Sequence, residues 1–384
     1  MQPSRTELEN DARRGLEAME AGDFTLARSA FERVAAAGGA TPQLWLLLAD
    51  ARNKLDDREA THAALDRVLE AEPRNLFALL MKGDLYSRSG DDRAAVSYYR
   101  LALSSAAAAT ALPGDLPQRL ERAAAAVAAA ERKFEEHLTT HLATAGIHDV
   151  PRRLAEAIDI ASGRREIYLQ QPTSFYYPGL PQIAWYDAGD FEWAAALEAR
   201  WQEMRAEIEA VLCDEQGVEP YVHAQKDRPS RGHSLLNDKR WSAFYLWRDG
   251  KPVEDHARRC PVTMELLELP PIPRVKGRSP MAMVSILRAG THIPPHTGML
   301  NSRLICHLPL VVPPGCRLRV GAETRTVEAG KMMIFDDSIE HEAWNDSDAV
   351  RAVLLFEIWR PELSEDERRA LAVAYEAIGA YPSG

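Results

Sequence analysis

The stretch MAMVSILRAGTHIPPHTGMLNSRLICHLPL, residues 281–310, decides the fold of the C-terminal half. It holds two mainly apolar runs, residues 281–288 and 303–310, and the segment between them is rich in Gly, Pro and Thr. Short apolar runs bounded by turn residues are typical of β-strands. The stretch therefore predicts two strands, with His296 just after the first of them.

Two further runs, residues 331–335 and 351–359, have the same character, and Pro, Gly, Trp and Tyr are frequent in this half of the chain. Several short strands separated by turns suit a double-stranded β-helix, also called a jelly roll. Because side chains alternate along a strand, Ser285, His307 and Arg351 share faces with apolar neighbours. Polar groups on otherwise apolar faces predict a lined pocket.

Two segments around these strands have helical spacing. Residues 192–212 place apolar side chains three and four residues apart, which predicts one helix packed against the sheet. Ser364 is followed three residues later by Glu367, a capping-box pattern that predicts the start of a final helix over residues 364–378.

The N-terminal third is an internal repeat. Phe31, Leu65 and Tyr99 lie 34 residues apart, and the turn pairs Gly22-Asp23, Asp56-Asp57 and Gly90-Asp91 and the small residues Ala27, Thr61 and Ala95 keep the same step. This is the tetratricopeptide period, with apolar helices before and after each turn pair. The array resembles three tetratricopeptide repeats.

Residues 116–142 read as one long Ala-rich amphipathic helix that caps the repeats. The sequence thus predicts an α+β protein of two domains: an all-α tetratricopeptide-like solenoid at residues 6–143, a helical linker at 144–171, and a jelly-roll or cupin-like domain with flanking helices at 172–384. The repeats either dock a peptide or protein, or serve to form a homo-oligomer or brace the other domain.

Composition excludes several classes of function. The chain has 384 residues and a formal net charge of -11, without the clustered Lys and Arg that a nucleic-acid backbone binder needs. The N-terminus is polar and no run approaches a membrane span, so we expect a cytoplasmic protein without a membrane partner. The four cysteines show no CxxC pairing, which predicts reduced thiols rather than a zinc site or disulfides.

His296 and His341 each follow a predicted strand, so they can meet on neighbouring turns at the mouth of a small barrel and bind iron(II). From spacing alone, two unrelated surface histidines are at least as plausible. Arg351 begins the next strand, where its guanidinium can pair with a carboxylate, and Ser285 offers an added donor. A surface ion pair is the alternative for Arg351.

The chain resembles the aspartyl/asparaginyl β-hydroxylases over roughly residues 176–363. Tetratricopeptide repeats also precede the oxygenase domain in that family. The motifs that carry the resemblance are Pro295-His296-Thr297-Gly298, Arg303-Leu304, His307-Leu308, Phe335-Asp336-Asp337-Ser338, Glu340-His341-Glu342, Trp359-Arg360-Pro361-Glu362-Leu363, Trp241-Ser242-Ala243-Phe244 and Tyr177-Pro178-Gly179-Leu180.

The resemblance implies a dioxygenase that uses iron(II), O2 and 2-oxoglutarate, releases succinate and carbon dioxide, and hydroxylates a side chain of a peptide or protein. His296 and His341 match the iron ligands and, with Arg351, form the implied catalytic set. Gly298 matches a family position where related oxygenases have an acidic ligand, so water is implied there. The implied cosubstrate pocket comprises Trp241, Ser285, Arg303, His307 and Arg351.

One residue departs from the family pattern. Ile305 stands where the animal enzymes have an Arg that is associated with recognition of the substrate carboxylate. Either Arg303 replaces it, or the substrate differs. A lipid or small metabolite as substrate is therefore one alternative, and a non-catalytic repeat scaffold with a degenerate barrel is another.

The acidic residues near His341 are candidates to orient the histidine rings, although each is equally suited to forming a turn. His292 lies close to His296 in sequence and is expected to be a structural histidine rather than a third ligand. The candidate orienting residues are Asp336, Asp337, Glu340 and Glu342.

Overall fold

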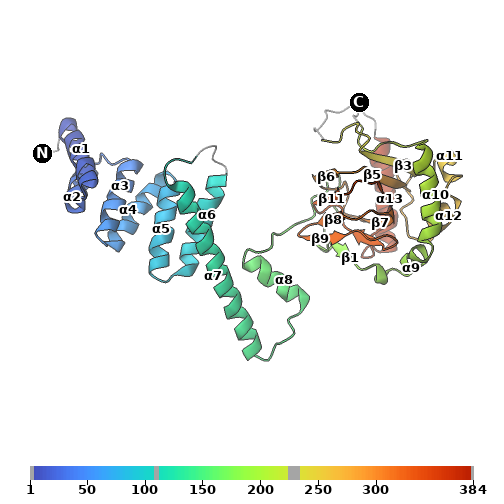
Figure 1. Ribbon diagram of the computed structural model, residues 1–384, viewed down its shortest axis with the longest axis horizontal. Coiled ribbons are helices and arrows are strands. Elements are labelled where there is room, and N and C mark those ends of the chain that lie inside the picture. Colours follow the sequence, from blue (N-terminus) through green and yellow to red (C-terminus); the bar gives the residue numbers. More distant parts are fainter. Residues whose placement is uncertain (1–3, 108–111, 224–233, 382–384) are drawn as a thin grey trace. The chain divides into compact units, whose positions relative to one another are not determined.

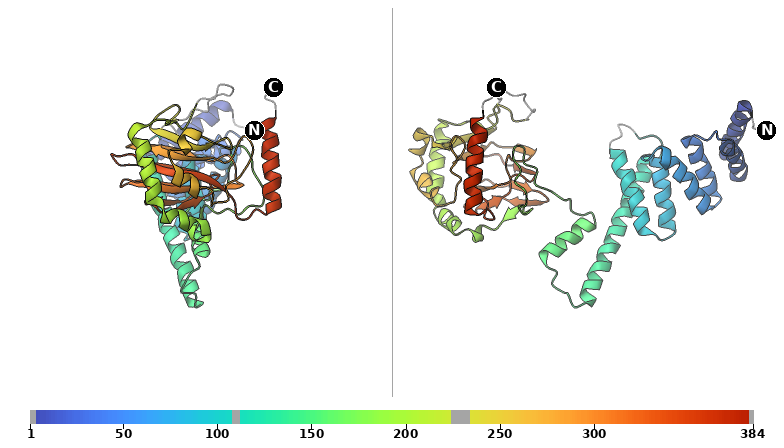
Figure 2. Two further views of the ribbon diagram at one scale, coloured as in Figure 1. Left: turned by 90° about the vertical axis from the view of Figure 1, so that its right-hand side faces the viewer. Right: turned by 180° about the vertical axis from the view of Figure 1, so that it is seen from behind.

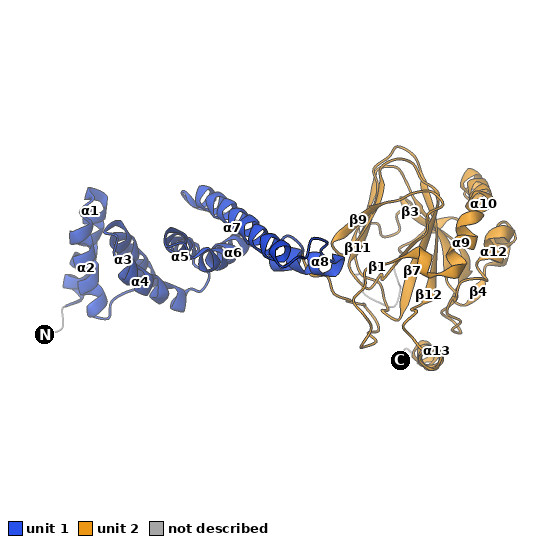
Figure 3. Ribbon diagram, turned by 90° about the horizontal axis from the view of Figure 1, so that it is seen from below, with its two compact units in different colours: residues 1–165 blue, residues 166–384 orange. Residues whose placement is uncertain are grey.

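The computed structural model describes residues 4–107, 112–223 and 234–381. The chain divides into two compact units, residues 1–165 and residues 166–384 (Figure 3). The first unit is helical and the second is built on β-sheets, as the sequence predicts.

The first unit begins with three helix pairs that follow one another along the chain (Figure 1). Gly22, Asp56 and Gly90 form the predicted turns and all have positive φ. The second residue of each turn pair is an Asp that accepts a hydrogen bond from a backbone N–H in the first turn of the next helix. That N–H has no partner within the helix. The helices are α1 (Arg5–Ala21), α2 (Phe24–Ala36), α3 (Pro42–Lys54), α4 (Arg58–Ala71), α5 (Leu76–Arg88) and α6 (Asp92–Ala107).

Small residues let the paired helices approach each other closely. Ala27, Thr61 and Ala95 are buried, which confirms the prediction made from their spacing. In the third pair, Gly83 of α5 lies against the ring of Tyr99, so that a Cβ at Gly83 would stand 2.4 Å from Tyr99 Cε1. The first pair repeats this contact between Gly15 and Phe31.

The predicted capping helix is α7 (Leu116–Thr144). Its buried residues, from Leu116 to Val127, all lie in its first half and pack against the third helix pair. The shorter α8 (Arg152–Ala161) follows, within the segment predicted as a helical linker, and has no buried residue. Arg100 of α6 donates to the carbonyl of Ser162 (3.0 Å), which ties the end of α8 to the repeats.

The second unit contains two antiparallel sheets. The larger sheet has the order β1-β10-β7-β12-β5-β3-β2, with β4 paired to β3, and the smaller has the order β6-β11-β8-β9. The strands are β1 (Trp185–Tyr186), β2 (Glu219–Pro220), β3 (Trp241–Arg248), β4 (Lys251–Pro252), β5 (Ala282–Leu287), β6 (Thr291–His296), β7 (Arg303–Val311), β8 (Cys316–Val320), β9 (Glu323–Thr326), β10 (Met333–Phe335), β11 (His341–Asn345) and β12 (Arg351–Trp359).

The four predicted strands are confirmed as β5, β7, β10 and β12. The placement of the two histidines was wrong in detail. His296 is the last residue of β6 and His341 the first residue of β11, so both lie on strands and not on turns after them. The sequence around β6 hides this because Pro294 and Pro295 resemble a turn.

Helices cover one face of the larger sheet (Figure 3). The predicted helix over residues 192–212 is interrupted at Arg200, whose backbone leaves helical geometry (φ -112°, ψ 18°). Its apolar positions nevertheless pack against the sheet, as predicted. The helices of this unit are α9 (Glu192–Ala199), α10 (Trp201–Asp214), α11 (Glu254–Ala257), α12 (Pro261–Leu266) and α13 (Glu365–Ala380), with a 3-10 turn at Ala188–Asp190.

The final helix α13 starts at the predicted capping box, in which Ser364 and Glu367 each bond the other's backbone N–H. It runs along the unit (Figure 2) and buries Leu371 and Tyr375 against Phe175 and Leu300.

The two faces of the larger sheet have separate cores. One core joins it to α9, α10 and α12, and the other fills the space between the two sheets. The second core includes Ile305 and Phe335 of the larger sheet and Ile293 and Leu318 of the smaller. This inner space also holds the predicted site residues.

Cys213, Cys260, Cys306 and Cys316 are all free thiols. Among the described residues, no helix is long and apolar enough to cross a lipid bilayer.

The contact between Gly83 and Tyr99 makes a stability prediction. Gly83→Ala should destabilise the protein by about 1–3 kcal/mol, because the ring has to move out of a packed interface. The matched control is Gly379→Ala in α13, where a Cβ meets nothing within 4 Å and a helical Ala is favourable. Thermal unfolding of both variants tests this, and a Gly83→Ala protein as stable as the wild type would contradict it.

Candidate metal and cosubstrate site

His296 and His341 are brought together by strand pairing. They are Cα partners in the antiparallel register of β6 and β11, and their ring centroids are 4.1 Å apart. A bulge follows His341 in this pairing, where the register with β6 shifts before Ala343. Two imidazoles this close can share one metal ion.

Backbone carbonyls fix the tautomer of both rings. Nδ1 of His296 donates to the carbonyl of Pro294 (2.8 Å) and Nδ1 of His341 donates to that of Ile339 (3.1 Å). Each lone pair therefore lies on Nε2, the nitrogen that a metal would bind. Burial, with His296 alongside, lowers the pKa of His341 to about 3, so this ring is neutral at physiological pH. At Nδ1 both rings are thus held by backbone carbonyls, whereas the sequence offered nearby carboxylates either for this role or as turn formers.

The space beside Gly298, two residues after His296, is filled by Asp337. A Cβ on Gly298 would stand 2.0 Å from Asp337 Oδ2, so no larger residue fits at position 298 without displacing that carboxylate. Among the residues that the structure describes, no group of three or more His, Cys, Asp or Glu side chains is arranged to hold a metal ion. His296 and His341 are thus the two candidate metal ligands of this site.

A cavity of about 510 Å³ between the sheets collects the predicted residues. One wall follows β12, where Arg351, Leu355 and Glu357 share a face. Glu357 is six positions after Arg351, which at the strand rise is about 20 Å. The other predicted residues that line the cavity are Trp241, Ser285, His296, Arg303, His307 and His341.

Arg351 lies at one end of this cavity and is 2% exposed. Its guanidinium makes no hydrogen bond or ion pair with any described residue, and its Nε is buried without a partner. Burial lowers the pKa of Arg351 to about 10, so the group remains a cation at neutral pH. A buried cation without a counterion is costly, which indicates that an anionic ligand completes it.

The neighbours of Arg351 provide polar atoms suited to the same ligand. Trp241 Nε1 donates to Ser285 Oγ (3.2 Å), which leaves the hydroxyl hydrogen of Ser285 for another acceptor. His307 Nδ1 is buried without a partner, and burial with Arg351 nearby lowers the pKa of His307 far below its usual value.

Arg303 is engaged by two buried carboxylates. It pairs with Asp337 (3.2 Å) and, more closely, with Glu357. Burial alone would lower the pKa of Arg303, but the two acids raise it, so the cation is already neutralised by the protein. Burial raises the pKa of Asp337 to about 6 despite its bond to Arg303. Sequence reasoning assigned no partner to Arg303, because Glu357 lies on another strand.

The remaining acidic candidates, Glu340 and Glu342, bond side chains other than His296 and His341. Glu342 bonds His292 Nε2 (2.8 Å), whose ring stacks on Trp344 with centroids 5.0 Å apart. Glu340 and Glu342 both pair with Arg319. His292 is therefore a structural histidine, as predicted.

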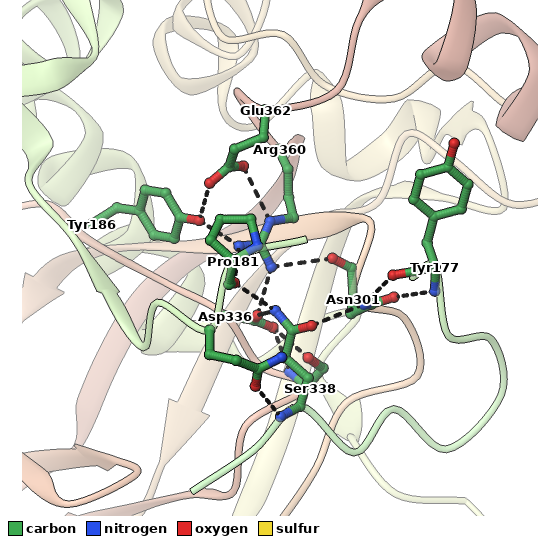
Figure 4. Close-up of polar contacts among 10 residues, drawn as sticks. Tyr177, Pro181, Tyr186, Asn301, Asp336, Ser338, Arg360 and Glu362 are labelled. Carbon is green, nitrogen blue, oxygen red and sulfur yellow. Dashed lines mark hydrogen bonds and ion pairs between the residues drawn. The ribbon is translucent and has the colours of Figure 1, made fainter. Parts of the chain in front are cut away.

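The sequence did not reveal the buried ion pair that holds the loop before His341. Arg360 and Asp336 have no exposed side-chain surface and their charged groups are 2.6 Å apart (Figure 4). Arg360 also donates to the carbonyls of Pro181 and Asn301. Asp336 further accepts from Gln170 Nε2 (2.7 Å) and from the hydroxyl of Ser338.

This network joins both histidine-bearing segments to the start of the unit. The N–H of Gln171 donates to Ser338, and that of Thr173 to Gly298. Asn301 Nδ2 bonds both Gln170 and the carbonyl of Tyr177 (Figure 4). The segment 170–177 is thus hydrogen-bonded to the loops next to His296 and His341.

Comparison with known proteins shows which families the two units are similar to. Residues 198–361 match the family described as Aspartyl/Asparaginyl beta-hydroxylase, and residues 78–108 match the tetratricopeptide repeat. The human aspartyl/asparaginyl beta-hydroxylase is 37% identical over 198 residues, which are 50% of this chain and 25% of that protein. The ornithine lipid ester-linked acyl 2-hydroxylase of Rhizobium tropici is 34% identical over 46% of this chain and 60% of its own.

The chain therefore spans a quarter of the human relative and three fifths of the bacterial one. Among solved structures, the tetratricopeptide domain of Sgt2 from Aspergillus fumigatus aligns with 34% of this chain and 84% of its own, at 16% identity and a TM-score of 0.29.

The contact between Gly298 and Asp337 is testable by substitution. Gly298→Ala should destabilise the protein by about 1–3 kcal/mol, because the new methyl displaces a buried carboxylate that pairs with Arg303. In an Asp337→Ala background the same Gly298→Ala change should cost less, since the methyl then has room. Equal melting temperatures for Gly298→Ala and the wild type would refute the close contact.

The ion pair of Arg360 makes a second prediction. Arg360→Met should cost about 3–5 kcal/mol, because it leaves Asp336 charged and buried without its main partner. The double variant Arg360→Met/Asp336→Asn should lose less than the sum of the two single changes. Urea unfolding of the four proteins measures the coupling, and additive losses would mean that the two groups act independently.

Proposed function

With residues 198–361 belonging to the aspartyl/asparaginyl β-hydroxylase family, we propose that this protein is an iron(II)- and 2-oxoglutarate-dependent dioxygenase that hydroxylates a side chain of a peptide or protein. The observation that carries the proposal is Arg351, a buried cation with no partner among the described residues, in the same cavity as two converging histidines.

The histidine pair suits iron(II). Both rings present the Nε2 lone pair, and two protein ligands leave coordination positions for a chelating keto acid and for O2. When bound, iron with 2-oxoglutarate and O2 would supply the oxidising chemistry that inserts one oxygen atom into an unactivated C–H bond, while the other oxygen atom enters succinate and carbon dioxide is released.

The Arg351 end of the cavity suits the distal carboxylate of 2-oxoglutarate. The guanidinium offers paired N–H donors, and the Ser285 hydroxyl, fixed by Trp241, can donate one more hydrogen bond. His307 provides a neutral ring in the same wall. Together these groups would hold the keto acid so that its other end faces the two histidines.

Apolar side chains form part of the cavity wall. Ile293 and Ile305 both line the cavity and are nearly inaccessible to solvent. Apolar walls of this kind would limit the water that can quench an oxidising centre. The repeats of the first unit are proposed to dock the peptide or protein substrate, a common use of such arrays.

A lipid or small metabolite is the second candidate substrate. Replacement of the missing Arg by Arg303 was one of the two alternatives, and Arg303 is paired with Glu357 and Asp337. A relative named as a lipid hydroxylase is 34% identical. The oxidative chemistry proposed is the same for either substrate.

The chemistry is tested by following succinate release from 2-oxoglutarate with iron(II) and O2. The wild type should show release that His296→Ala and His341→Ala abolish, because each removes one metal ligand. A wild type without activity, or full activity after loss of either histidine, would contradict the proposal. Mass spectrometry of a proteome treated with active protein and with His296→Ala protein then identifies hydroxylated peptides.

The role of Arg351 is tested separately. Arg351→Met should raise the KM for 2-oxoglutarate by about 10- to 100-fold, the usual loss for a hydrogen bond to a charged group. The KM of Arg351→Lys should lie between those of the wild type and Arg351→Met, because Lys keeps the charge without the paired donors. Arg317→Met, which removes an exposed arginine of β8, is the control and should leave KM unchanged. An unchanged KM in Arg351→Met would place the cosubstrate elsewhere.

A further inference from the structure

We propose that Arg278 binds an anionic group of the substrate, a carboxylate or a phosphate, while an aliphatic part of that substrate lies against Ile305. This inference rests on the proposed function, because it concerns the end of the same cavity opposite Arg351. It identifies a recognition residue and a substrate class.

Strand register defines this opposite end. Glu357 pairs with Ile305, and the next position on the same face pairs Trp359 with Arg303. These positions lie six to eight residues along β12 from Arg351. A substrate therefore meets this wall, while the cosubstrate occupies the other one.

Arg303 is not free to bind a substrate anion. Its guanidinium is held by Glu357 and by Asp337, and all three side chains are at most 12% exposed. Breaking such a pair leaves a buried charge uncompensated, which usually costs more than one new contact returns. An anionic substrate needs another cation.

Arg278 is that cation. It lines the cavity and is partly buried, and it forms no ion pair with a described residue. Its guanidinium lies 4.9 Å from the ring centre of Tyr375, so an aromatic face holds it in position without neutralising it. Burial and the nearby charge of Arg303 both lower the pKa of Arg278. A bound anion would offset both effects by stabilising the charged form of Arg278.

The acids at this end do not supply the missing partner. Glu357 already binds Arg303 and Ser279. Asp249 lines the same end of the cavity, but it is exposed and is not paired with Arg278. Arg278 thus lines the cavity without an ion pair to any described residue, and a partly buried cation of this kind favours an anionic ligand.

Part of the cavity lining is apolar. Met281, Met299 and Leu355 line the cavity together with Ile305. Methionine and branched side chains adapt to an aliphatic chain and give no hydrogen bond to a polar group. The anion is therefore recognised at Arg278, and the carbon chain is recognised by these apolar side chains.

Binding of a series of eight-carbon probes tests this. Octanoate, octyl phosphate, octan-1-ol and octylammonium share one chain and differ only in the head group. Each is titrated into full-length protein with zinc, which does not support turnover, and with saturating 2-oxoglutarate to fill the Arg351 end. Ligand-observed NMR gives the dissociation constants.

The wild type should bind at least one of the two anions about ten-fold more tightly than octanol, and octylammonium most weakly. Arg278→Met should reduce the preference for the anion to about one, and Arg278→Lys should keep most of it. Arg274→Met is the matched control from the same loop, since Arg274 is exposed and paired with Glu268, and it should behave as the wild type.

Equal binding of octanol and both anions by the wild type, or a preference that survives Arg278→Met, would overturn the inference. Binding of none of the probes would also overturn it. Circular dichroism checks that each variant is folded, and Arg278→Lys serves if the Met variant is not. The tighter anion identifies the carboxylate or the phosphate.

Failure of the proposed function gives a different result. Without the dioxygenase activity, iron(II) and 2-oxoglutarate yield no succinate, whatever the probes do. Without the role of Arg278, succinate is produced but the probes bind without regard to head group.

Discussion

The antiparallel pairing of β6 with β11 is the interaction on which the site depends. It places His296 opposite His341, and it belongs to the smaller sheet, which faces the larger sheet across the cavity. A shift of one residue in this register would turn one histidine to the outer face of the sheet. The buried pair of Arg360 with Asp336 and the segment 170–177 hold the adjoining loops, so the register is fixed from outside the strands as well.

Arg351, at the start of β12, and Arg360, just after its end, are both buried but have different roles. Arg360 is fully buried with Asp336, and its donors are used by protein acceptors. Arg351 is equally inaccessible but has no such partner among the described residues. The first arginine stabilises the loop before His341, and the second marks a ligand site, because a buried guanidinium needs an anion in either case.

Much of this was predictable from the sequence, because periodicity and local motifs reflect short-range structure. The 34-residue repeat predicted the helix pairs and the apolar runs predicted β5, β7, β10 and β12, while the candidate site residues lie among those that line the cavity. Contacts between distant strands were not predictable. The pairing of Arg303 with Glu357 and of Arg360 with Asp336 depends on strand order, which no local pattern shows. Arg278 was missed for the same reason.

X-ray absorption at the metal edge tests the central claim most directly. Protein loaded anaerobically with iron(II) and 2-oxoglutarate should bind one metal ion per chain, with two imidazole ligands and otherwise oxygen ligands, and His341→Ala should leave one imidazole. A third imidazole, a sulfur ligand, or an unchanged spectrum in His341→Ala would contradict a centre built by the register of β6 and β11.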